Sequence, residues 1–76
     1  MAKRNKVRWT GGRIRSLRQH LRMTQQELSD ELGIRQQTVS EWERALYLPR
    51  GSSATLLTIV AERSGFDYGA IDDSAT

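Results

Sequence analysis

Apolar residues recur along the chain at three- and four-residue intervals, which is the spacing of helices rather than of strands. The first such run is Ile14, Leu17 and Leu21, with charged and amide side chains on the opposite side. Thr10 precedes it as a suitable N-cap, and Trp9 is expected to pack on Ile14 as a hydrophobic staple. The pattern therefore predicts a first helix that starts after Thr10.

A second helix is indicated by the segment "TQQELSDELG". Thr24 and Glu27 have the spacing of a capping box, in which each side chain bonds the backbone amide of the other residue. Leu28 and Leu32 form an apolar stripe, and Gly33 follows at the place where a left-handed residue ends a helix. We therefore expect a helix that ends near Leu32, followed by a tight turn into a third helix at residue 35 or 36.

The third predicted helix, residues 36–45, has two distinct faces at about 100° per residue. Its polar arc consists of Gln36, Gln37, Ser40, Glu41 and Arg44, and its apolar arc continues through Thr38, Val39, Trp42 and Leu46. The apolar arc is expected to face the core, so Trp42 is interpreted as a core residue rather than as a platform for stacked bases. Two adjacent glutamines are poor core residues, which indicates that the polar arc faces a hydrogen-bonding partner.

The loop "YLPRGSS" separates this helix from a fourth one, which Ser52 or Ser53 caps and Gly65 ends. A short fifth turn is expected around Phe66–Ile71, and residues 73–76 are expected to fray. At 76 residues the chain is expected to hold one domain. These elements predict an all-α fold, a compact bundle of four to five helices over residues 10–72.

Basic residues are concentrated at the N-terminus, where the first 22 residues carry eight lysines and arginines and no acidic residue. Beyond Gly51, acidic residues outnumber basic ones. This asymmetry favours a polyanionic partner, and residues 1–9 are interpreted as a flexible basic arm; a solvated tail that only aids solubility is the alternative. The pair Gly11–Gly12 either weakens the first helical turn or forms a hinge after this arm.

The absence of cysteine and the single histidine, His20, argue against disulfides and against a metal site. No run of apolar residues is long enough for a membrane span or a signal peptide, so a cytoplasmic location is expected. No carboxylate pair in an evident pocket accompanies His20, so neither an enzyme nor a cofactor is predicted.

The segment "IRSLRQHLRMTQQELSDELGIRQQTVSEWERA" resembles the XRE/Cro phage-repressor class of helix-turn-helix domains. The resemblance implies a lambda repressor-like DNA-binding domain, with its helix-turn-helix at about residues 24–45. It further implies that Gln25 contacts a phosphate, and that Arg18 and Glu43 form a partly buried salt bridge. The residues that it places against base edges are Gln36, Gln37, Ser40 and Glu41.

The chemistry of these residues supports a division between base readers and phosphate anchors. A glutamine amide offers a donor and an acceptor in one plane, which matches adenine in the major groove. Glu41 is the difficult residue, because phosphates repel a carboxylate unless it accepts a hydrogen bond from cytosine. The residues expected on the sugar-phosphate backbone, beside Gln25, are Arg35, Thr38, Arg44, Arg50, Lys3, Arg4, Lys6 and Arg8.

The sequence departs from the family pattern at two positions within this segment. Ala45 stands where relatives carry glycine, so an extra turn of the third helix and an altered loop are expected. Ser29 replaces alanine, which has little consequence if its hydroxyl bonds a backbone carbonyl. Few residues follow the bundle, so we expect regulation through dimerisation, concentration or a partner rather than through a sensor domain.

The predicted function is that of a small transcriptional regulator, a repressor in the simplest case, which binds a (pseudo)palindromic operator in double-stranded DNA as a homodimer. The apolar residues expected at the dimer surface are Leu46, Leu48, Phe66, Tyr68 and Ile71. The alternative is an antitoxin-type module that binds a toxin and autoregulates its own operon. The basic arm favours DNA, and the protein would then be nucleoid-associated, whereas the acidic C-terminal segment suits a basic protein partner.

Overall fold

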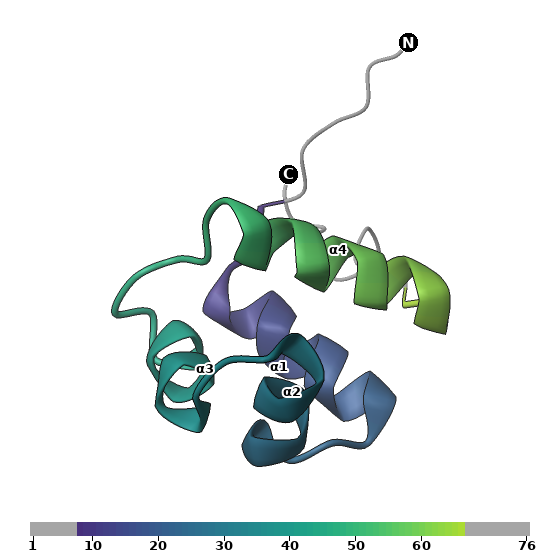
Figure 1. The fold of residues 1–76 in the computed structure, drawn as a ribbon, viewed down its shortest axis with the longest axis horizontal. Helices are drawn as coiled ribbons and strands as arrows, with labels where there is room; N and C mark the ends of the chain where they lie inside the picture. The colour runs from purple at the N-terminus through teal and green to yellow at the C-terminus, as the bar shows by residue number, and fades with distance from the viewer. Residues whose placement is uncertain (1–7, 67–76) are drawn as a thin grey trace, which may run out of the picture.

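Four α-helices make up residues 8–66, the part of the chain that the computed structural model describes. They are α1 (Gly11–Leu21), α2 (Gln25–Leu32), α3 (Gln36–Glu43) and α4 (Ser52–Ser64). Figure 1 shows α4 along one side of the molecule, the other three helices beside it, and α3 at one end. The all-α prediction is confirmed. The predicted fifth turn, beyond Phe66, and the predicted tail at residues 73–76 lie outside the described residues.

The starts of α1 and α2 follow from the capping residues that the sequence predicts, whereas the prediction that Ser52 or Ser53 caps α4 is wrong, because its N-cap is Gly51 and no side chain caps the helix there. Thr10 is the N-cap of α1, and its side chain accepts a hydrogen bond from the backbone N–H of Arg13 over 3.2 Å. At α2 the capping box is complete, because Thr24 accepts from the Glu27 amide at 3.0 Å while the Glu27 carboxylate accepts from the Thr24 amide at 2.8 Å. Each cap satisfies backbone donors that a helix start leaves without a partner inside the helix.

All four helices end in the same way, with one residue in the left-handed conformation. These residues are Arg22, Gly33, Ala45 and Gly65, with φ between 60° and 75°. In each case the next residue donates its backbone N–H to the carbonyl five residues earlier, over 2.9–3.0 Å. This closing bond satisfies carbonyls that the helix end exposes, which offsets the strain of a left-handed side chain at the two positions without glycine.

The expectation of an extra turn at the end of α3 is wrong. The helix ends at Glu43, and Ala45 takes the left-handed conformation with φ of 63°. Leu46 then bonds back to the carbonyl of Glu41 at 3.0 Å, and the chain turns away from the helix axis. Leu46, predicted on the apolar arc, is consequently 60% exposed.

Replacing Ala45 with glycine is expected to raise the free energy of unfolding by about 0.5–1 kcal/mol, because glycine adopts positive φ without the clash of a Cβ atom. Gly33→Ala is the matched control. A Cβ atom there meets nothing within 4 Å, so the substitution costs only the strain of an alanine at positive φ. It should lower stability by about the same amount. Urea denaturation of both variants tests this, and a less stable Ala45→Gly protein would contradict it.

The core is assembled from one apolar stripe of each helix. Its buried members are Trp9, Ile14, Leu17, Leu28, Leu32, Val39, Trp42, Leu57 and Ala61. Trp9 belongs to this core and not to a flexible arm, because its Nε1 donates to Thr58 Oγ1 at 3.0 Å and its ring stacks on Phe66 with centroids 6.4 Å apart. Ordered packing therefore begins before α1, while residues 1–7 of the predicted arm lie outside the described residues.

The first residue of α1 lies against the last turn of α3. A Cβ atom on Gly11 would stand 2.6 Å from the carbonyl oxygen of Trp42 and 2.9 Å from that of Glu43. Gly11 is buried and helical, so the hinge alternative is wrong. Ser29 is also buried, and its hydroxyl donates to the Gln26 carbonyl at 2.7 Å as expected. Small residues at these places let the helices approach closely.

Candidate nucleic-acid interface

The exposed face of α3 follows from how its opposite face is buried. Val39 is fully buried and Trp42 is 2% exposed, so the interpretation of Trp42 as a core residue is confirmed. α3 follows α2 after the three residues from Gly33 to Arg35, and this short connection keeps the two helices in contact. Gln36 and Gln37 are consequently exposed at the start of α3. Ser40 and Glu41, one turn further on, are half-buried.

The far end of α3 is anchored by the carboxylate of Glu43, whose side chain is 2% exposed. Arg18 of α1 donates to both of its oxygens, from Nε at 2.7 Å and from Nη2 at 2.9 Å. Arg15 adds a more distant ion pair at 3.6 Å. Burial on its own raises the pKa of Glu43, but hydrogen bonds from Arg18 and Gln25 and the two arginine charges outweigh it and hold that pKa below its usual value. Glu43 therefore stays ionised at neutral pH.

Gln25 and Gln36 continue outward from this carboxylate as a hydrogen-bonded chain. Gln25 Nε2 donates to Glu43 Oε1 at 3.2 Å, and Gln36 Nε2 donates to Gln25 Oε1 at 3.0 Å. An ionised carboxylate only accepts hydrogen bonds, so it fixes the orientation of Gln25, and Gln25 in turn fixes that of Gln36. The outer edge of Gln36 is thereby left with its carbonyl oxygen and one N–H.

A second chain links Gln37, Glu41 and Tyr47 on the same face. Gln37 Nε2 donates to Glu41 Oε2 at 3.0 Å, and the Tyr47 hydroxyl donates to Glu41 Oε1 at 2.7 Å. These bonds, first that of Tyr47 and then that of Gln37, lower the pKa of Glu41. The same bond to Glu41 raises the pKa of Tyr47, so the carboxylate and the phenol keep their charge states at neutral pH.

Sequence reasoning missed Tyr47 and Arg15 as members of this site. Tyr47 follows Glu41 by six residues, and helical periodicity does not place these two residues together. They meet because the chain reverses at Ala45. Arg15 carries a helical signal, since it lies one turn before Arg18 on α1 and so reaches the same carboxylate.

The predicted phosphate anchors surround α3 rather than line it. Arg35 is its N-cap, Arg44 follows its last residue, and Arg50 belongs to the loop before α4; all three are exposed. Thr38 is half-buried on α3 itself. The remaining predicted anchors divide into Arg8, which is exposed, and Lys3, Arg4 and Lys6, which lie outside the described residues. Gln25 uses its amide within the protein, so its phosphate contact stays a prediction.

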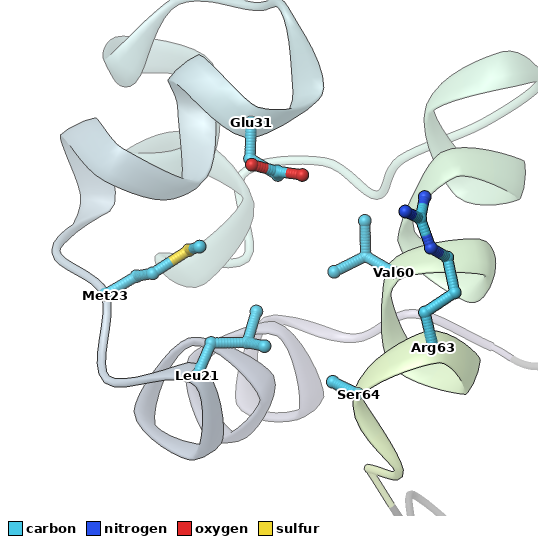
Figure 2. Close-up of a pocket in the computed structure, with 6 residues that line it drawn as sticks. All are labelled: Leu21, Met23, Glu31, Val60, Arg63 and Ser64. Atoms are coloured by element: carbon cyan, nitrogen blue, oxygen red, sulfur yellow. The ribbon is translucent and has the colours of Figure 1, made fainter.

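A separate pocket of about 280 Å³ lies between α1, α2 and α4, without any residue of α3. Figure 2 shows Leu21, Met23 and Val60 beside this hollow, with Glu31 and Arg63 from opposite helices at its rim.

Within residues 8–66, no group of three or more acidic or histidine side chains is placed to hold a metal ion. None of the described helices is long and apolar enough to cross a membrane.

His20 has a structural position at the other end of α1. Its Nε2 lies 3.0 Å from the carbonyl oxygen of Ser64, and its ring lies 5.5 Å from that of Phe66. Because a carbonyl only accepts, the nitrogen that faces Ser64 is the protonated one. His20 is exposed, and this contact links the end of α1 to the end of α4.

Two helices joined by a tight turn, the second with a buried apolar arc and an exposed polar arc, define a helix-turn-helix DNA-binding fold. The helix-turn-helix family model matches residues 14–61, and the chain belongs to this family, in its XRE/lambda-repressor-like class. Proteins of this class are DNA-binding transcriptional regulators. No curated protein and no solved structure matches the chain.

Proposed function

We propose that the protein is a sequence-specific repressor that places α3 in the major groove of double-stranded DNA. The observation that carries this proposal is the hydrogen-bonded chain from Glu43 through Gln25 to Gln36. It holds an exposed amide at the start of α3 with a donor and an acceptor on its outer edge. Such an edge matches N7 and N6 of adenine, and residues at the start of a recognition helix are the ones that approach base edges.

The charges around α3 support the same interface. Arg35 and Arg44 stand at its two ends, and Arg50 follows in the next loop. Basic side chains in these places can neutralise phosphates on either side of the groove while the amide side chains between them face the bases. The acidic member, Glu41, is bonded by Gln37 and Tyr47 and so does not present two bare oxygens to the phosphates.

We further infer that the protein binds DNA as a homodimer, with half-sites about one helical turn apart. Support comes from large apolar side chains outside the core. The exposed ones are Leu46 and Leu48 in the loop after α3, and Leu56 and Ile59 on α4, with exposed fractions between 39% and 60%. Phe66, expected at the dimer surface, packs against the core instead, and Tyr68 and Ile71 lie outside the described residues.

Selection of binding sites from random double-stranded DNA tests this proposal, with a palindromic site of two half-sites as the expected result. Gln36→Ala should reduce affinity for the selected site by about 10-fold or more and relax the preference at one position per half-site, while affinity for random DNA stays the same. Gln19→Ala, which removes an exposed glutamine on α1, is the matched control and should change neither affinity.

Two results would count against the proposal. Equal losses on selected and random DNA would remove Gln36 as a base reader. Binding of DNA only in the presence of a co-purifying second protein would favour the antitoxin-type alternative, because the exposed apolar residues around Leu48 suit a protein partner as well as a second copy. Light scattering of the protein with and without its operator separates these assemblies by mass.

A further inference from the structure

We propose that Tyr47 is a specificity-determining residue, which holds the Glu41 carboxylate in place to accept a hydrogen bond from the amino group of a cytosine in the major groove. This inference rests on the proposed function and names a second base that the interface recognises. Tyr47 acts as a positioning residue, since its hydroxyl bonds Glu41 at 2.7 Å. Gln37 holds the other oxygen at 3.0 Å from one turn earlier on α3.

The held carboxylate keeps the capacity to accept further hydrogen bonds. A carboxylate has about four acceptor positions, two on each oxygen, and the two bonds from Tyr47 and Gln37 occupy one on each. Glu41 lies on the polar face of α3, one turn after the two exposed glutamines. An outside donor that meets this face therefore finds an acceptor whose orientation is already fixed.

Cytosine is the base whose major-groove edge fits such an acceptor. Only cytosine and adenine present a donor there, in each case an exocyclic amino group. The adenine amino group lies between two acceptors, N7 of the same base and O4 of the paired thymine, and both would repel a carboxylate. The cytosine amino group has an acceptor on one side only, O6 of the paired guanine. Glu41 thus selects a C·G pair, whereas the amide of Gln36 selects adenine.

The hydrogen bond from Tyr47 reduces the energetic cost of placing the Glu41 carboxylate near DNA phosphates. A free glutamate would be repelled by phosphates and would lose side-chain freedom on entering the groove. Two donors distribute part of the charge and fix the side chain before DNA arrives, so less side-chain freedom is lost on binding. The same two hydrogen bonds lower the pKa of Glu41, so it remains an acceptor at neutral pH.

The left-handed residue Ala45 explains how Tyr47 reaches this place. A helix that continued past Glu43 would carry residue 47 on around the axis, away from Glu41. The closing bond from Leu46 to the Glu41 carbonyl turns the chain back instead, at 3.0 Å. Tyr47 is then half-exposed beside the polar arc, at 48% of its surface. Ala45 permits this reversal because it adopts the left-handed conformation, with φ of 63°.

Binding-site selection with three proteins, the unmodified chain, Tyr47→Phe and Glu41→Gln, tests the inference. The unmodified chain should select cytosine at one position of each half-site. Glu41→Gln should change that preference toward adenine, because an amide offers both a donor and an acceptor. Tyr47→Phe, which removes only a hydroxyl, should weaken the cytosine preference at that position at least 5-fold and leave the adenine position of Gln36 unchanged.

The control is Thr55→Val, which removes an exposed hydroxyl that bonds the carbonyl of Gly51, the N-cap of α4, and should alter no base preference. A Tyr47→Phe protein that keeps the cytosine preference overturns the inference, as does one that loses all preferences equally. Unchanged selection by Glu41→Gln also overturns it. These failures leave the proposed function standing if Gln36→Ala still relaxes its own position, whereas an unmodified chain that selects no DNA site overturns both.

Discussion

Replacing Arg18 with methionine is expected to lower the free energy of unfolding by about 3 kcal/mol, because it leaves the buried Glu43 carboxylate without its main partner. The two bonds at 2.7 and 2.9 Å are lost, while Arg15 at 3.6 Å and Gln25 at 3.2 Å remain. The estimate is at the low end of the range for broken buried pairs, since the Arg18 side chain is 20% exposed. Urea denaturation followed by circular dichroism measures the loss.

Two controls separate pairing from packing in this experiment. Arg35→Met removes an exposed arginine and should change stability by no more than about 0.5 kcal/mol. The double variant Arg18→Met/Glu43→Leu removes both charges and should recover most of the loss, because apolar side chains replace a buried ion pair at little net cost. It should nevertheless lose selectivity for adenine, since Gln25 and Gln36 no longer have Glu43 to orient them. A double variant as unstable as Arg18→Met would contradict the role of the pair.

The pH dependence of stability gives an independent measure of the same pair. The pKa of Glu43 is held below its ordinary value of 4.5 in the folded protein, so its unfolded form binds a proton first as the pH falls. The stabilisation is fully present above that ordinary value and is lost as the pH drops through the folded value. In Arg18→Met this loss should become smaller. An acid profile that is unchanged between the two proteins would show that Arg18 does not set the pKa of Glu43.

The fold was predictable wherever a local interaction decides the structure. Thr24 and Glu27 cap α2 through bonds over three residues, and Leu28 and Leu32 repeat at the spacing of one helical face, so sequence spacing carries both signals. The end of α3 was predicted wrongly because Ala45 is not a residue that marks a left-handed turn. There the closing bond of Leu46, rather than the preference of the residue itself, fixes the conformation.

The candidate site was predictable in the exposed glutamines of α3, and not in Tyr47, Arg15 or the hydrogen bonds that connect its members. The polar arc of α3 identifies Gln36 and Gln37 as residues that face outward, and the structure places them there. Which groups these amides bond is a tertiary property, since Gln36 meets Gln25 across two helices and Gln37 meets Glu41 on its own helix. The sequence leaves the orientation of each amide open. The buried charge of Glu43 fixes one of them, and this determines which edge Gln36 can offer to a base.

Gly11→Ala is expected to cost about 2–3 kcal/mol of stability, because the added methyl group has no room. It would meet backbone oxygens of Trp42 and Glu43 at 2.6 and 2.9 Å, and backbone atoms cannot rotate away as a flexible side chain does. α1 and the end of α3 must move apart to admit it. Since Glu43 holds the chain of bonds to Gln36, the same displacement should also weaken binding to the selected DNA site.

Gly12→Ala is the matched control for this substitution, because a Cβ atom there meets nothing within 4 Å. It should raise stability slightly, by about 0.5 kcal/mol, since alanine has less freedom than glycine to lose on folding and favours the helix. The same chemical change at adjacent residues thus has opposite expected signs. Thermal or urea denaturation of the two variants measures the difference. If Gly11→Ala proved as stable as Gly12→Ala, α1 would not be held against the last turn of α3, and the position of Glu43 would need another explanation.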